Sequence, residues 1–324
     1  MGLWPDRPYD STSPEGQQAG NLLANGYFGV LWAVMGDLDY MASVLNLPRY
    51  SSAANPCSLC RCSSVGVGTW TDNRPNAGWM EQCWTSATWL AWDGRSKCPL
   101  FSLPGVTALT VCLDYMHCKY LGMDQYMFGS DLYLLVHHVL TFGTPQENLN
   151  HIWIEIKQYY GRCKTPCRFR YLNRLSMFMR RNKTHKLRGK AAEIKYFGVV
   201  LLWVWNKYMN QALAIHRQIS LMLQMNLRME TILTLCRDCT VLTDGYAEEF
   251  KQCAFDMAQL NSQVSEHFLE DEEANLFVVT TKLHMVMHCA LLAKHINPRL
   301  VWCFSGEDMM KHGQILASSC VKCL

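Results

Sequence analysis

The sequence lacks the features of a membrane-spanning or secreted protein. No apolar run approaches the length of about 18 residues that a membrane-spanning helix needs. The longest run, FGVVLLWVW at 197–205, predicts a buried helical segment instead. The first residues, MGLWPDRPYDSTSPEG, contain no basic stretch followed by an apolar one, so they do not resemble a secretory signal. We therefore expect a soluble, intracellular protein.

The motifs of several common enzyme classes are also missing. The chain contains no GxSxG nucleophile motif, no P-loop and no GxGxxG fingerprint. Cys118 follows His117 directly and is a candidate nucleophile beside a base. Adjacent residues seldom face each other, however, so this pair is a weak indication of catalysis.

Charge is scarce overall and unevenly distributed. Only 18% of residues are charged and 49% are hydrophobic, which favours a packed core over disorder. Between positions 157 and 190 there are twelve Lys or Arg and no Asp or Glu, with Tyr and Phe among them. Such a segment suits DNA, because cations neutralise phosphates, although a solvated basic surface has the same pattern. The predicted DNA-binding residues are Arg168, Arg170, Arg174, Arg180, Arg181, Lys183, Lys186, Arg188 and Lys190.

Cysteine is abundant, and some of it is spaced as metal ligands are. The chain has sixteen cysteines. Without a secretory signal, metal binding or plain burial is favoured over disulfides. Two thiolates at CxxC spacing make half of a tetrahedral zinc site. This spacing occurs three times, at Cys57/Cys60, Cys236/Cys239 and Cys320/Cys323, so it selects no site by itself.

A pair of histidines could complete the site. His284 and His288 are four residues apart in LHMVMH, on one face of a predicted helix. With Cys57 and Cys60 they would form a closed Cys₂His₂ set, which is typical of structural zinc. Two alternatives remain open: a local cysteine site, and a second pair from elsewhere. The cysteines concerned are Cys62 with Cys83 or Cys98, and Cys236 with Cys239.

The hydrophobic pattern predicts a mostly helical chain with two buried strands. Apolar, β-branched runs at 26–37 and 106–117 predict strands that end near Asp37 and Asp114. From about 123 to 296 the pattern is mainly helical. A last helix follows, and its first turn carries Glu307 and Asp308, as the helix dipole favours.

The order of these motifs resembles the DDE transposases with an RNase H-like catalytic core, especially the CACTA-type group, and the catalytic subunit of the V(D)J recombinase. The stretches GDLDYMASVLNLPRY…NPCSLC and LDYMHCKYLGM carry the resemblance, together with HxxxH and the acid that follows it. It implies an α/β fold that is mostly α, with a partial RNase H-like core. The implied organisation is a loose leader at 1–20, a core formed by 21–122 and 297–324, and an all-helical insertion at 123–296 that carries the DNA-facing segment 157–190.

The resemblance also implies roles for single residues. Asp37 would be the second catalytic carboxylate and Glu307 the third, with Asp308 competing for that role, and Asp114 and His117 would support them. Such carboxylates hold two Mg²⁺ ions during phosphodiester cleavage. A structural zinc would tie the insertion to the core through Cys57, Cys60, His284 and His288. Asp37 alone is equally explained as a helix N-cap, and Glu307 as an acid at a helix start.

The first catalytic Asp of that family has no counterpart here. Only thirty-six residues precede Asp37, and their acids, Asp6, Asp10 and Glu15, lie in the polar leader. We therefore expect a truncated, nuclear, transposase-derived domain that binds DNA and cleaves it negligibly on its own. DNA and a second copy of the chain are the expected partners, with neither a membrane nor a small-molecule substrate. The alternative is a zinc-stabilised protein-interaction module that uses Trp70, Trp79, Trp84, Trp89 and Trp92.

Overall fold

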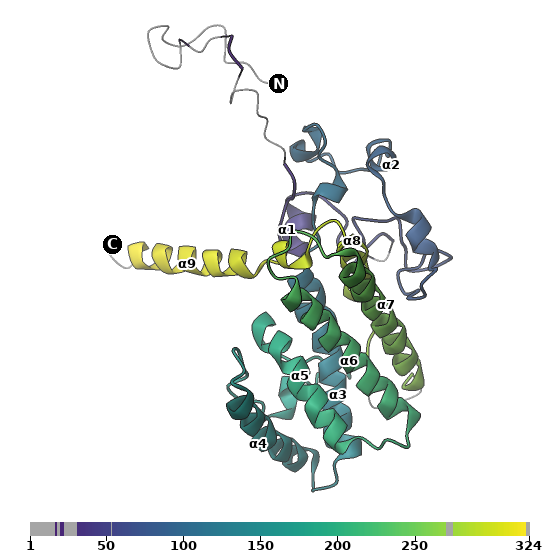
Figure 1. Cartoon of the computed structure of the whole chain (residues 1–324), viewed down its shortest axis with the longest axis vertical. Coiled ribbons are helices and arrows are strands. Elements are labelled where there is room, and N and C mark those ends of the chain that lie inside the picture. The colour runs from purple at the N-terminus through teal and green to yellow at the C-terminus, as the bar shows by residue number, and fades with distance from the viewer. Residues whose placement is uncertain (1–16, 18–19, 23–30, 53, 270–274, 322–324) are drawn as a thin grey trace.

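The protein consists of a helical body with an irregular region at one end (Figure 1). The computed structural model describes residues 17, 20–22, 31–52, 54–269 and 275–321, with side chains for all of these except 307, 308, 320 and 321. The expected leader and the first part of the expected strand 26–37 therefore lie largely outside the described residues. Every described helix is too short or too polar to span a lipid bilayer.

Helices dominate the described residues, which confirms the mostly helical prediction. The irregular region contains only short ones: α1 (Leu38–Ser43), η3 (Gly78–Gln82), α2 (Ser86–Leu90), η4 (Pro99–Ser102) and η5 (Ala108–Thr110). The body begins with three consecutive elements, the π-helix η6 (Met116–Met123), α3 (Asp124–Leu134) and the π-helix η7 (Leu135–Val139). It continues with α4 (Pro145–Cys163), η8 (Leu175–Met177), α5 (Ala191–Tyr208), α6 (Ala214–Leu235), α7 (Asp244–His267) and α8 (Thr281–Leu292). The 3-10 turn η9 (Pro298–Leu300) then leads into α9 (Phe304–Val321).

Local sequence sets several of these boundaries. Thr144 accepts a hydrogen bond from the Glu147 backbone N–H, and the Glu147 carboxylate accepts one from the Thr144 N–H at 2.7 Å. This capping box starts α4, with Pro145 in its first turn. The helix ends at Lys164, whose φ of 48° lies in the left-handed region.

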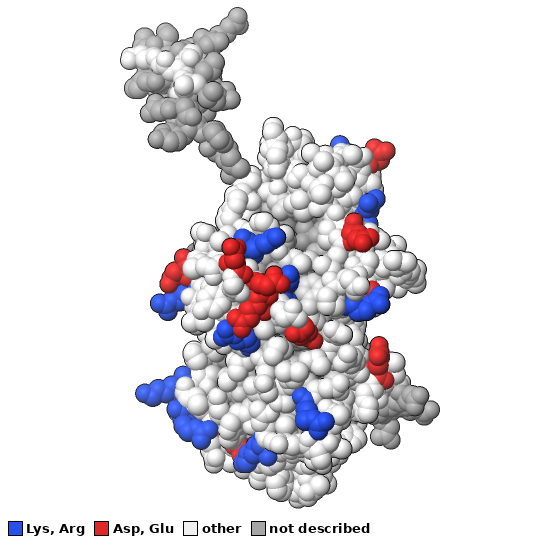
Figure 2. All heavy atoms as spheres, turned by 45° about the vertical axis from the view of Figure 1, so that its right-hand side comes forward, with Lys and Arg blue, Asp and Glu red and all other residues white. Residues whose placement is uncertain are grey.

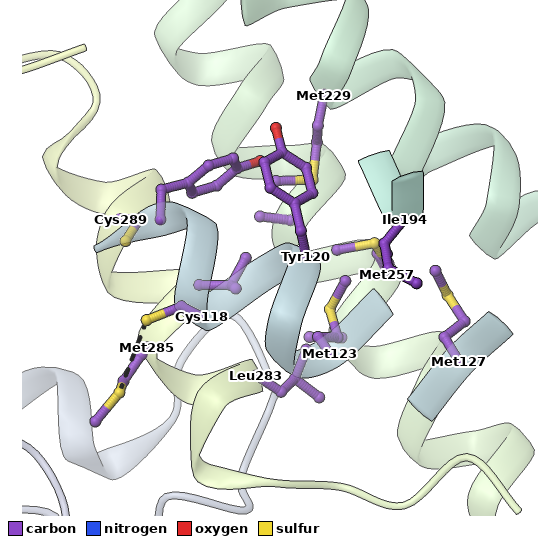
Figure 3. Close-up of a cluster of buried hydrophobic side chains, with 14 of the residues drawn as sticks. Cys118, Tyr120, Met123, Met127, Ile194, Met229, Met257, Leu283, Met285 and Cys289 are labelled. Atoms are coloured by element: carbon purple, nitrogen blue, oxygen red, sulfur yellow. Dashed lines mark hydrogen bonds between the residues drawn. The ribbon is translucent and has the colours of Figure 1, made fainter. Parts of the chain in front are cut away.

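The core of the body lies where η6 packs against α5 and α8, α3 packs against α5, and α6 and α7 continue the same packed layer. Figure 3 shows that many of its side chains contain sulfur, among them Cys118, Met123, Met257 and Met285. The Cys118 Sγ lies 3.9 Å from the Met285 Sδ, which joins η6 to α8. Flexible thioethers fill irregular space well, so they suit the kinked π-helical path of η6.

A charged cluster lies buried in the same body. The Lys119 side chain is fully buried, and its Nζ contacts the Asp124 Oδ2 at 2.8 Å, the Glu230 Oε1 at 3.1 Å and the Asn226 Oδ1 at 3.2 Å. Burial lowers the pKa of Lys119, but the two carboxylates outweigh this and raise it. Burial raises the pKa of Asp124 to about 6. The ion pairs of this cluster connect η6 to α3 and α6.

The two predicted strands are wrong as regular strands. Segments 31–37 and 106–115 meet at an isolated parallel bridge between Val34 and Val111, with the Val34 N donating to the Thr110 O at 2.9 Å and the Cys112 N donating to the Val34 O at 3.0 Å. No sheet is present among the described residues. An apolar, β-branched run predicts burial, and Val111 and Leu113 are indeed buried. A strand also needs paired neighbours along its length, and the described parts of these runs pair only at this one bridge.

Candidate metal centre

Five metal-binding side chains meet in one buried place. Cys57, Cys60 and Cys62 come from the loop before η3, and His284 from α8, and their ligand atoms all lie within 4.8 Å of one another. The fifth is His288, one turn further along α8, whose Nε2 lies 3.3 Å from the Cys60 Sγ. Cys57, Cys60, Cys62 and His284 are the one group of three or more such donors, among the described side chains, that lies close enough together to hold an ion.

The distances between these ligand atoms are close to those around a tetrahedrally coordinated metal ion. The His284 Nε2 lies 3.3 Å from the Cys60 Sγ and 3.1 Å from the His288 Nε2. In tetrahedral zinc, bonds of about 2.3 Å to sulfur and about 2.0 Å to nitrogen place neighbouring ligand atoms roughly 3.4–3.8 Å apart. The observed separations lie slightly below that range. A small ion with cysteine and histidine ligands, such as zinc, would therefore fit the cluster.

The electrostatics of the three thiols also indicate a cation. Burial raises the pKa of Cys57, but hydrogen bonds from Cys60 and Cys62 and the nearby His288 ring outweigh this and hold its pKa well below the usual value. The hydrogen bond to Cys57 is in turn the largest cause that raises the pKa of Cys60 and of Cys62. A divalent cation would let all three thiols deprotonate.

Burial and aromatic packing favour metal binding by His284 and fix the position of both histidine rings. Burial lowers the pKa of His284, which favours the neutral imidazole. Trp79 is fully buried and packs against both rings, with centroids 4.5 Å from His284 and 4.7 Å from His288. The Trp79 Nε1 donates to the Asp72 backbone O at 2.8 Å, which fixes the indole. The Leu59 N donates to the Cys57 Sγ at 3.4 Å.

The cluster combines both sets of ligands that the sequence left open. Cys57, Cys60, His284 and His288 meet as the resemblance implied, and Cys62 joins them as the local alternative implied. Cys83 pairs with the backbone of Cys60, but its Sγ contacts the Trp79 O instead. The structure does not bring Cys98, Cys236 or Cys239 into the cluster. In the sequence only the CxxCxC spacing of residues 57–62 pointed to Cys62, and this spacing is a weak signal.

The acids with predicted catalytic roles have structural partners. The exposed Asp37 caps α1, and its Oδ1 accepts from the Tyr40 N at 2.6 Å, which confirms the N-cap interpretation. Asp114 is fully buried, and its Oδ1 accepts from the Met116 N and the Cys303 N, both at 3.0 Å. Its Oδ2 contacts the Nδ1 of the partly exposed His117. These bonds tie the start of η6 to the segment before α9.

Glu307 lies on α9, and its side chain is outside the described residues. The catalytic roles of Asp37, Asp114, His117 and Glu307 stay predictions. The parallel bridge of Val34 with Val111 places Asp37 and Asp114 three residues beyond it on each segment. The two acids therefore follow the same end of the paired segments.

The basic segment 157–190 lies on the surface, and its buried side chains anchor it to the helical body. Its buried side chains include Phe169, Phe178 and Leu187, and the Leu187 N donates to the Gln125 O at 2.7 Å. The chain comes so close to α3 that a Cβ at Gly129 would lie 2.8 Å from its backbone atoms. Of the predicted DNA-binding residues, Arg180 and Lys186 are half-buried, and the exposed ones are Arg168, Arg170, Arg174, Arg181, Lys183, Arg188 and Lys190.

Acids near these arginines are few. Within the described part of the chain, no ion pair joins Arg168, Arg170, Arg174 or Arg188 to a carboxylate. On the face in Figure 2, most acidic side chains lie in the upper and middle parts, and several Lys and Arg side chains stand apart lower down.

The alternative prediction used five tryptophans as a protein interface. Trp79, Trp84 and Trp89 are buried and belong to the core instead.

No protein-family model, curated protein or solved structure matches the chain. The metal cluster and the basic segment are therefore interpreted from their own chemistry.

Proposed function

We propose that the chain is a zinc-stabilised, DNA-binding domain derived from a DDE transposase. The basic segment carries the proposal. Arg168, Arg170, Arg174 and Arg188 are exposed and form no ion pair with a described carboxylate, and the backbone that carries them is anchored by buried aromatic and aliphatic side chains. Arginines in that state gain most from phosphate oxygens, because they give up no ion pair when DNA binds. Such a domain would act in the nucleus.

The metal cluster supports the proposed ancestry. Cys60 and His284 are 224 residues apart in sequence, yet their ligand atoms meet. A zinc ion there would join the CxxC loop to the HxxxH helix, as the resemblance to the transposases implies. A partial RNase H-like core is the further part of this proposal, with the Val34–Val111 bridge as its remaining strand contact.

Catalysis with Mg²⁺ is not part of the proposed function of this chain alone. Both Asp114 oxygens accept bonds from protein groups, and the Asp37 carboxylate caps a helix. A ligand already bonded in this way would have to exchange its partners for a metal ion. We expect no strand cleavage above that of an Asp37→Ala control with Mg²⁺ or Mn²⁺.

Duplex DNA binding at several salt concentrations tests the function. In fluorescence anisotropy, log K should fall linearly with log salt concentration. The variant Arg168→Ala/Arg170→Ala/Arg174→Ala should weaken binding and lower the slope by roughly three. The matched control is Arg49→Ala/Arg217→Ala/Arg237→Ala, which removes the same charge from exposed residues elsewhere. Equal losses in both variants would mean that net charge, and not this segment, governs binding.

Helix α9 favours a second candidate, a protein-interaction module. Figure 1 shows α9 extending away from the helical body. Its Met309, Met310 and Leu316 side chains are 72%, 67% and 66% exposed. A group of exposed apolar side chains on one helix is typical of an interaction surface. If α9 mediates self-association, light scattering should show a dimer that Met310→Lys/Leu316→Lys converts to a monomer. A wild-type monomer at high concentration would remove this candidate.

A further inference from the structure

A second cationic feature lies between the metal-bearing region and the basic segment. It is a pocket of about 460 Å³ whose lining contains Lys186 and Lys282, Ser and Thr hydroxyl groups, and the aromatic rings of Tyr50 and Tyr126. No Asp or Glu lines it. The lysines are 96 positions apart in sequence, so the fold and not a local run brings them together.

The two lysines are half-buried. Burial lowers the pKa of Lys282, whereas Cys118, Asp114 and Asp39 act on it from a distance and raise it. Among the described residues, no carboxylate forms an ion pair with Lys186 or Lys282. Burial and the positive charges of Lys282 and Arg180 lower the pKa of Lys186, so three cations act on one another here. Removing cations from water without a counter-ion is costly, and an anionic ligand would relieve that cost.

Both ammonium groups are held in place. The Lys282 Nζ donates to the Leu121 O at 3.2 Å and lies 5.3 Å from the Tyr50 ring centroid. Its stem passes over Gly122, where a Cβ would lie 2.6 Å from the Lys282 Cδ. The Lys186 Nζ lies 5.1 Å from the Tyr126 ring centroid. These contacts preorganise the charges, because the rings attract the cations without neutralising them.

The start of α8 adds donors and a hydroxyl group to the same pocket. Thr280 is the N-cap of α8, yet its side chain makes no capping hydrogen bond. Its Oγ1 is buried and has no hydrogen-bond partner among the described residues. The unpaired N–H groups of a first helical turn and the helix dipole favour an anion. Cations, a free hydroxyl and helix N–H groups together are the chemistry that recognises phosphate.

We propose that this pocket binds one phosphate group of a nucleic-acid strand that continues from the basic segment. The proposal rests on the proposed DNA-binding function, and it names where the strand is held most firmly. Lys186 belongs to both the segment and the pocket, so the two surfaces are continuous. The exposed arginines attract the strand, whereas the pocket fixes its position.

The variant Lys186→Met/Lys282→Met tests the pocket in the full-length, zinc-loaded protein. Against a fluorescein-labelled 20-mer duplex, we expect affinity to fall roughly tenfold or more and the salt slope to fall by about two. Lys97→Met/Lys294→Met removes two exposed lysines elsewhere and should change affinity far less. Gly122→Ala keeps both charges but displaces Lys282, and it should weaken binding as well. Far-UV circular dichroism and zinc content check that every variant is folded.

The outcomes distinguish a failure of the pocket proposal from a failure of the proposed DNA-binding function. If the pocket variant binds DNA as its control does, while Arg168→Ala/Arg170→Ala/Arg174→Ala weakens binding, the pocket proposal is overturned and the proposed function stands. If the wild type binds no DNA, the function fails, and calorimetry with inorganic phosphate then decides the ligand. Phosphate binding lost in Lys186→Met/Lys282→Met would overturn the nucleic-acid ligand in favour of free phosphate. An absence of phosphate binding would overturn the site altogether.

Discussion

The irregular region 31–113 and the helical body 116–292 are stabilised in different ways. No helix in the first exceeds six residues, whereas helices in the second reach 24 residues. The body packs long apolar helix faces together, so its stability is distributed over many contacts. The irregular region places three cysteines against two histidines of α8. A region with little regular structure depends on a few strong bonds, and the predictions below test that difference.

The largest expected effect is on the irregular region. Cys60 contacts both histidines, so Cys60→Ser should weaken zinc binding and destabilise that region more than the loss of Cys62 or His288 does, because structural zinc contributes folding energy. Hydrogen exchange should show lost protection over 57–113, while α5 and α6 stay protected. Cys239→Ser, an exposed cysteine outside the cluster, is the control. Retained protection with zinc absent would mean that the region folds without a metal.

The next prediction concerns the fifth potential metal ligand, which a four-coordinate ion does not need. Five groups surround a position that takes four ligands, so Cys62→Ser and His288→Ala should each leave one zinc per chain, and the double variant, with three ligands, should bind zinc more weakly than either. Elemental mass spectrometry measures the zinc. With cobalt in its place, the sulfur-to-metal absorption should lose about a third of its intensity in Cys62→Ser if three thiolates bind. Unchanged absorption would leave a Cys₂His₂ site.

In the body, the strongest single test is the buried ion cluster. Lys119→Met leaves Asp124 and Glu230 buried without their cation, and should lower the free energy of unfolding by about 3–5 kcal/mol. Urea unfolding measures this. Lys251→Met breaks a surface pair with Glu248 and should change stability by less than about 1 kcal/mol. Similar values for both variants would show that the cluster is not desolvated as described.

Gly129 offers a test of how the basic segment is anchored. A Cβ there would meet backbone rather than a movable side chain, so Gly129→Ala should cost about 1–3 kcal/mol and reduce DNA affinity. Gly161, within α4, has nothing within 4 Å of its added Cβ, so Gly161→Ala should stabilise by about 0.5–1 kcal/mol. The two glycines should thus differ in sign, and a common sign would contradict the close approach.

The smallest effect is expected at the start of α4. Thr144→Ala removes one half of the capping box and should cost about 1 kcal/mol, without change in zinc content. Thermal unfolding measures it. Thr144→Ser keeps the hydroxyl and should be nearly neutral, so an equal loss in both would exclude capping as the cause.

How much of this could be predicted depended on the range of the contact. Helices α4, α6 and α7 followed from local apolar spacing, and the HxxxH pair from one helical turn. The strands at 26–37 and 106–117 could not be judged locally, because a strand exists only through its pairing partners. Cys62 was visible as an alternative, but only the fold brings it to His284. The Lys186–Lys282 pocket left no trace in the sequence, because its lysines belong to different elements.

Helix α8 carries Lys282 in its first turn and His284 two residues later. If the proposed metal and phosphate sites are both occupied, the two ligands would act on the position of one short helix. Thermodynamic reciprocity follows: if a bound metal increases the affinity for phosphate by some factor, bound phosphate increases the affinity for the metal by the same factor. A chain that loses its metal would then release its strand, so metal supply would control occupancy on DNA.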